Sequence, residues 1–133
     1  MAIQSSRTER ATGSLLRRVL RVAAWLLFAF IVFATLSPID LRPVSLLPVN
    51  LERAAAFAVL GVVFALAYPR HMVLVAGLIA VTAVGLEVLQ ILGPGRHGRL
   101  LDLLVKAAGG LFGIAMALVL HRVRQSRISP EPR

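Results

Sequence analysis

The chain has 133 residues, of which 58% are hydrophobic, and its mean hydropathy is +0.82. A soluble domain this small needs a mostly polar exterior, so the composition excludes an ordinary water-soluble protein. Cysteine is absent, which excludes disulfides, a thiol nucleophile and cysteine-based metal sites. The net charge of +9 comes mainly from arginines beside apolar segments, which is typical of membrane topology control. We therefore expect membrane lipids, and no nucleic acid, as partners.

Residues 1–16 are polar and basic, and we expect them to form a disordered tail. The first apolar run begins at Val19 or Val22 and ends at Leu36. Basic residues before an apolar run are also typical of a signal peptide. No A-x-A cleavage site follows the run, however, and cleavage would remove one wall of a small bundle. We therefore interpret it as the first membrane helix.

Three further apolar runs cover residues 51–68, 72–92 and 100–120. A proline-rich segment, 37–50, precedes them, and prolines at that density exclude a continuous helix there. Two short turns separate the runs. Each run approaches the roughly 20 residues that span about 30 Å of hydrocarbon. The sequence thus predicts an all-α bundle of four transmembrane helices over residues 17–121, followed by a polar tail over 122–133.

The distribution of arginines predicts the orientation of the bundle. The segments before the first run and after the last run carry most of the basic residues, whereas the connecting loops carry few. Basic residues concentrate on the cytoplasmic side of bacterial membrane proteins. We therefore expect both termini in the cytoplasm, and a multi-pass protein of the bacterial cytoplasmic (inner) membrane.

Small residues recur at helical spacing on one face of three predicted helices, which favours close helix packing. The sets are Ala54, Ala58, Gly61 and Ala65; then Ala76, Ala80 and Ala83; then Gly109, Gly113 and Ala117.

Two charges lie inside the apolar runs. Glu87 lies about 7.5 Å before the end of the third run, and Lys106 lies about 9 Å into the fourth. Because a short turn joins these antiparallel helices, the two side chains lie at similar depth. An isolated charge in the membrane costs at least about 2.5–3.5 kcal/mol, so we expect a Glu87–Lys106 contact. Gln90 and Asp102 should adjoin it, within reach of Arg96 or Arg99; the alternative is a purely structural ion pair.

The other polar residues are less specific. Glu52 and Arg53 open the second helix, where a carboxylate suits the helix dipole. His71, His97 and His121 fall on opposite membrane faces, so we predict neither a metal site nor a cofactor.

These residues resemble the VanZ-like membrane protein family. That family typically shows an Asp-Lys pair and His-Phe opening the second helix, Glu-x-x-Gln near the end of the third, and a Pro-Gly-Arg loop. An Asp follows, with an Asn four residues later and then a Gly. The chain matches this order with the residues Glu52, Arg53, Phe57, Glu87, Gln90, Pro94, Gly95, Arg96, Asp102 and Gly109.

The chain departs from this pattern in three places: Ala56 stands at the family's His, Lys106 stands at its Asn, and the Asp-Lys pair has become Glu52-Arg53, which keeps the charges. The resemblance covers roughly residues 30–120. It implies a four-helix membrane protein, and some members are associated with resistance to glycopeptide antibiotics such as teicoplanin.

The favoured function is a non-enzymatic module that binds an anionic lipid headgroup or cell-envelope intermediate at the outer face. The candidate binding residues are Glu52, Arg53, Glu87, Gln90, Arg96, Arg99, Asp102 and Lys106. One alternative is an enzyme acting on a lipid phosphate with Glu87 or Asp102 as general base, although no nucleophile or metal set supports it. Another is a structural subunit whose small-residue faces dock partner helices.

Overall fold

A computed structural model describes residues 2–37, 48–91 and 100–128. They form four α-helices: α1 (Ala2–Leu36), α2 (Val49–Ala67), α3 (Met72–Ile91) and α4 (Leu100–Ile128). Every helix contains a segment that is long and apolar enough to cross a membrane. These segments are Thr12–Leu36, Val49–Ala67, Met72–Ile91 and Leu100–Ser126. The predicted all-α, four-span architecture is therefore confirmed.

Two helices are longer than the sequence predicted. α1 begins at Ala2, where we expected a disordered tail up to residue 16, and α4 continues to Ile128 instead of ending near residue 120. No proline interrupts either extension, and arginine, glutamate and glutamine are good helix formers. Because adding a residue to an existing helix costs far less than nucleating one, both apolar helices continue into the polar flanks.

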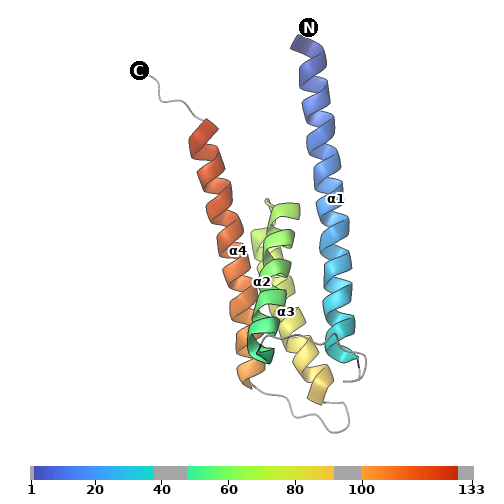
Figure 1. Cartoon of the computed structure of the whole chain (residues 1–133), viewed down its shortest axis with the longest axis vertical. Coiled ribbons are helices and arrows are strands. Elements are labelled where there is room, and N and C mark those ends of the chain that lie inside the picture. The colour runs from blue at the N-terminus through green and yellow to red at the C-terminus, as the bar shows by residue number, and fades with distance from the viewer. Residues whose placement is uncertain (1, 38–47, 92–99, 129–133) are drawn as a thin grey trace.

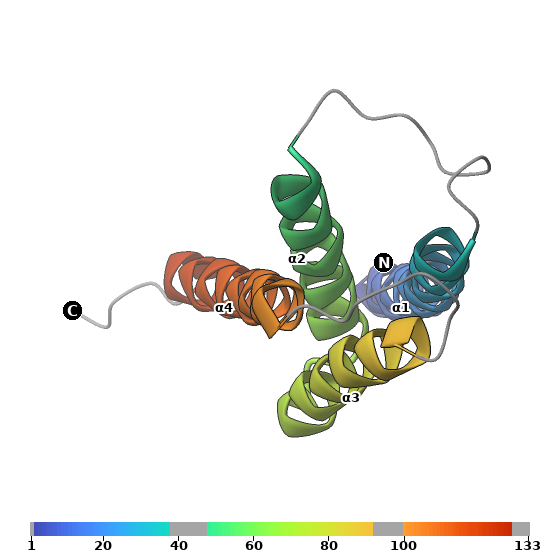
Figure 2. The same ribbon diagram turned by 90° about the horizontal axis from the view of Figure 1, so that it is seen from below.

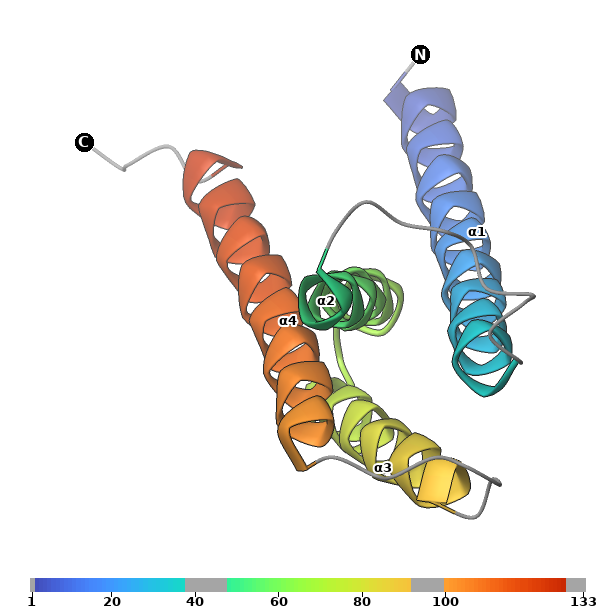
Figure 3. The ribbon, with the colours of Figure 1, turned by 60° about the horizontal axis from the view of Figure 1, so that its bottom comes forward.

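α2 lies at the centre of the bundle. It packs most extensively against α4 and also contacts α1 and α3. α1 and α4 flank α2 on opposite sides (Figures 2 and 3). The beginning of α1 and the end of α4 lie at one end of the molecule, which we call the terminal end (Figure 1). The beginnings of α2 and α4 and the end of α3 lie at the opposite end, which we call the loop end (Figure 1).

Glycines allow α2 and α4, which run parallel, to approach closely. A Cβ atom on Gly109 would collide with the backbone of Ala54, and one on Gly113 would collide with the backbone of Ala58. A Cβ atom on Gly61 would likewise collide with the backbone of Gly110. The small-residue faces predicted for these two helices therefore form an intramolecular interface.

The small-residue face predicted for α3 is only partly correct, because Ala83 is buried but Ala80 is exposed. α3 meets its neighbours through larger side chains as well, including Val75, Ile79 and Leu86. It therefore does not need an unbroken row of alanines in order to pack.

Apolar side chains fill the middle of the bundle. Phe57, Leu60, Phe64 and Ile79 are almost completely buried there. Large hydrophobic residues elsewhere, such as Val73 on α3, are exposed on the outside of the helices. That distribution is the one required when lipid, rather than water, surrounds the protein.

An aromatic cluster joins α1 to α2 toward the terminal end. The indole Nε1 of Trp25 donates a hydrogen bond to the Tyr68 hydroxyl at 3.1 Å. The guanidinium of Arg21 lies 5.2 Å from the centre of the Tyr68 ring, and Phe64 stacks on the same ring. The sequence places Trp25 and Tyr68 near one membrane interface, and the structure brings them into contact.

The α2–α4 interface predicts the outcome of adding a single methyl group. Gly113→Ala should lower the free energy of unfolding by about 1–3 kcal/mol, because the new Cβ must push the two backbones apart. Gly77→Ala is the matched control, since no atom lies within 4 Å of its added Cβ. It should leave stability unchanged or raise it by up to about 1 kcal/mol. Unfolding in detergent, followed by Trp25 fluorescence, measures both, and equal stability of the two variants would contradict the packing.

The cytoplasmic location of both termini stays a prediction from the arginine distribution. Green fluorescent protein fused after Arg133 should fluoresce, and alkaline phosphatase fused there should be inactive, because the former folds in the bacterial cytoplasm and the latter only in the periplasm. The opposite pattern would reverse the orientation.

Candidate functional site

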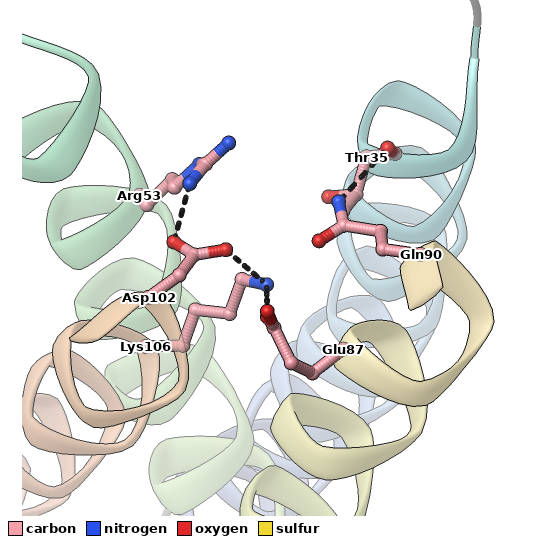
Figure 4. A network of polar contacts seen from close by, with 6 residues as sticks. All are labelled: Thr35, Arg53, Glu87, Gln90, Asp102 and Lys106. Carbon is pink, nitrogen blue, oxygen red and sulfur yellow. Dashed lines mark hydrogen bonds and ion pairs between the residues drawn. The ribbon is translucent and has the colours of Figure 1, made fainter. Parts of the chain in front are cut away.

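The most buried charge of the described residues is Lys106, whose side chain is only 1% exposed. Its ammonium Nζ lies 3.1 Å from Glu87 Oε2 on α3 and 2.7 Å from Asp102 Oδ2 on α4 (Figure 4). The predicted Glu87–Lys106 contact is therefore present, and Asp102 adjoins it as expected. Both carboxylates are nearly as buried as the lysine.

The helical spacing of α4 explains why these groups meet. Asp102 and Lys106 are four residues apart and so lie one above the other on the same face of α4. Gly109 and Gly113 continue that face, and they bring it against α2. On α3, Ala83, Glu87 and Gln90 share the buried face that turns toward the interior. The packing of apolar and small residues therefore carries the polar residues of both helices inward.

Arg53 on α2 extends the cluster toward the loop end. Its Nη1 atom lies 2.5 Å from Asp102 Oδ1, so each oxygen of the Asp102 carboxylate has its own cation. Among the described residues, Oδ1 has no hydrogen-bond donor beyond this ion pair. The Arg53 side chain is 29% exposed, against 5% for that of Asp102. Three ion pairs thus link four side chains in the order Arg53–Asp102–Lys106–Glu87, and we call this series of ion pairs the ion chain.

The signs of the charges alternate along the ion chain, and its net charge is zero. Such an arrangement offsets part of the large cost of burying ions, provided that every ion keeps a partner. Three helices contribute to it, since Arg53 comes from α2, Glu87 from α3, and Asp102 and Lys106 from α4. The ion chain therefore ties these helices together at one depth.

Gln90 lies beside the ion chain without being part of it. Its Nε2 donates a hydrogen bond of 3.4 Å to the backbone carbonyl of Thr35 near the end of α1. Gln90 and Thr35 face Arg53 from the opposite side of the loop end (Figure 4). A role for Thr35 had no signal in the sequence, because a backbone carbonyl accepts hydrogen bonds whatever its side chain.

Three candidate residues remain: Glu52, which the structure describes, and Arg96 and Arg99, which it does not. Glu52 is partly exposed in the first turn of α2, as expected from the helix dipole, and no ion pair of the described residues includes it. Arg96, Arg99 and His97 lie outside the described residues. In the described part of the chain, no group of three or more histidine, aspartate or glutamate side chains is placed to hold a metal ion.

The architecture and the ion chain together define a multi-pass membrane protein with ionised groups buried between its helices. Residues 3–121 match the sequence model of the VanZ/LLP1 family, which is most of the chain. The protein therefore belongs to the VanZ/LLP1 family. No curated protein and no solved structure matches it.

The family motifs meet in space at the loop end. Arg53, Glu87 and Asp102, which carry part of the resemblance, are three of the four members of the ion chain. The fourth member is Lys106, at the position where the family pattern has Asn. In this chain, Lys106 thus supplies the cation that holds the two carboxylates together.

Removing Lys106 tests the ion chain. Lys106→Met should lower the free energy of unfolding by about 3–5 kcal/mol, because it takes away the cation between two buried carboxylates. In the double variant Glu87→Gln/Lys106→Met, Asp102 keeps Arg53 and one negative charge is gone, so about half of the loss should be recovered. Chemical unfolding in detergent measures these two variants and the single variant Glu87→Gln. A double variant that loses the sum of the two single losses would show that the residues are not coupled.

Proposed function

We propose that the protein binds an anionic lipid headgroup, or a cell-envelope intermediate that carries one, at the loop end of the bundle. The observation that carries this proposal is the position of Arg53, which is partly exposed while its partners in the ion chain are buried. One of its Nη atoms is directed at Asp102, and a guanidinium has five N–H donors, so donors remain for a ligand.

Lys106 has a different role from the one first expected for it. Its side chain is buried and contacts two carboxylates, so it organises the site instead of meeting the ligand. It neutralises Asp102 and Glu87, which would otherwise repel an anion. Arg53 then acts as an oriented cation at the mouth of the site, and Gln90 provides an amide nearby.

The positive-inside distribution of arginines supports an outer location for this site, in the outer leaflet of a bacterial cytoplasmic membrane. A lipid phosphate or a cell-envelope intermediate is the class of ligand available there. Binding of such an intermediate would alter sensitivity to glycopeptide antibiotics, such as teicoplanin, that act on the envelope. The support for this last step is the family resemblance.

Two observations favour this function over its alternatives. An enzyme would need a nucleophile or metal set, and the ion chain supplies only carboxylates that are already paired with cations. A subunit that docks partner helices through small residues would need those residues at its surface. Gly61, Gly109 and Gly113 are instead used between α2 and α4.

Short-chain phosphatidic acid is a suitable probe, because it carries a phosphate headgroup and dissolves without forming a bilayer. Arg53→Gln should weaken its binding to the detergent-solubilised protein by about tenfold to a hundredfold, as expected for the loss of a charge-assisted hydrogen bond. Arg53→Lys should weaken it less. Microscale thermophoresis measures the affinity.

Arg18→Gln is the control, because it removes the same charge from an exposed position in the first half of α1. It should leave binding of the probe unchanged. Wild-type affinity in Arg53→Gln, or equal weakening in both variants, would refute the proposed site.

A further inference from the structure

Two carboxylates of the ion chain converge on one point, which the Lys106 ammonium occupies. Its Nζ atom lies 3.1 Å from Glu87 Oε2 on α3 and 2.7 Å from Asp102 Oδ2 on α4 (Figure 4). These distances suit charge-assisted N–H···O hydrogen bonds and exceed the roughly 2.3–2.6 Å between Ca²⁺ and its oxygen ligands. Among the residues that the structure describes, no group of three or more acidic or histidine side chains could hold a metal ion. The point is therefore suited to an ammonium group.

A flexible stem carries the nitrogen to this point. The lysine side chain has four methylene groups, and the residue is only 1% exposed. Truncation to alanine removes all of the side chain except its first carbon, and the atoms removed correspond to one propylammonium ion. Buried packing relaxes only partly after such a truncation, so a cavity of that shape should remain beside the two carboxylates. Engineered buried cavities of this kind can bind small molecules that match them.

The charge balance of the ion chain depends on the same ammonium group. Without it, Arg53 would be the one cation beside the carboxylates of Asp102 and Glu87, and the ion chain would carry a net charge of −1. An anion that approached Arg53 would then be repelled by the excess negative charge, whereas a cation would be attracted. Lys106 therefore decides which sign of charge the ion chain favours.

We propose that Glu87 and Asp102 form a binding site for a primary ammonium group, and that Lys106 occupies it as a ligand built into the chain. A protein that lacks this side chain takes up a small alkylammonium ion at the same point. Because the wild-type protein fills the site from within, its loop end selects anionic ligands through Arg53. This last consequence rests on the proposed function, whereas the ammonium site does not.

Rescue of Lys106→Ala by propylammonium tests the site. A ligand that binds only the folded protein raises the ratio of folded to unfolded protein, by about tenfold when its concentration is about ten times its Kd. Propylammonium should produce this rise, because it replaces the atoms that the substitution removes. Tetramethylammonium at the same concentration should not, because it has no N–H donor for the carboxylates. Chemical unfolding in detergent, followed by the fluorescence of Trp25, measures the ratio, since Trp25 is the only tryptophan of the chain.

Two further variants locate the bound ion. Lys106→Met nearly keeps the length of the side chain and leaves little space, so propylammonium should not stabilise it. Glu87→Gln/Lys106→Ala keeps the cavity but removes one of the two carboxylates. Its affinity for propylammonium should be at least about tenfold lower than that of Lys106→Ala, as expected for the loss of a hydrogen bond to a charged group.

Binding of short-chain phosphatidic acid tests the consequence for selectivity. Lys106→Ala should bind this lipid about tenfold more weakly than the wild-type protein, because of the uncompensated negative charge. Propylammonium should restore the affinity. In Glu87→Gln/Lys106→Ala, the remaining pair of Arg53 and Asp102 is neutral, so the affinity should recover without propylammonium. A purely structural role of the lysine does not predict that recovery, because the double variant still lacks the side chain.

The outcomes separate this inference from the proposed function. Equal effects of propylammonium and tetramethylammonium on Lys106→Ala, or an equal stabilisation of Lys106→Met by propylammonium, would overturn the ammonium site. Wild-type affinity for phosphatidic acid in Lys106→Ala without propylammonium would overturn its role in selectivity. If the wild-type protein does not bind phosphatidic acid but propylammonium stabilises Lys106→Ala as described, the proposed function fails and the ammonium site is supported.

Discussion

The structure depends on the placement of one ammonium group between two carboxylates. Lys106 is the only lysine of the chain, and all other basic side chains, histidine apart, are arginines. A lysine ammonium is a compact point charge with donors in several directions, whereas a guanidinium is a planar fork. A compact cation can lie between Glu87 and Asp102, which come from different helices, at 3.1 and 2.7 Å. Around it, the apolar surroundings make every unpaired charge costly, so the three helices are held at one relative depth.

The glycines of α4 allow the ion chain to form. Arg53 reaches Asp102 only because α2 and α4 approach until backbone meets backbone at Gly109 and Gly113. In lipid, no hydrophobic effect drives the two helices together, so close packing and polar contacts have to stabilise the pair. Packing and ion pairing therefore support each other: the glycines set the approach, and the ion chain sets the register.

The sequence was sufficient for the fold and for part of the site. Apolar runs and prolines predicted the four helices, and depth along two antiparallel helices predicted the Glu87–Lys106 contact. Depth does not fix how a helix is rotated about its axis. The Arg53–Asp102 pair and the Gln90–Thr35 hydrogen bond were missed for that reason, since they join helices that are not consecutive in the chain. The exposure of Ala80 was missed for the same reason, because periodicity identifies one face of a helix but not the helix that packs against it.

The two ends of the bundle use their charges in opposite ways. At the loop end, anions and cations alternate and cancel, and only Arg53 is partly exposed. At the terminal end, Arg17, Arg21 and Arg124 are exposed. Phe57, Leu60 and Phe64 form a buried apolar layer between the two ends. A neutral, ordered cluster is suited to recognising one ligand in a fixed orientation, whereas exposed like charges attract any anionic headgroup at their depth. The division of charge thus separates an ordered, neutral cluster at the loop end from exposed cations at the terminal end.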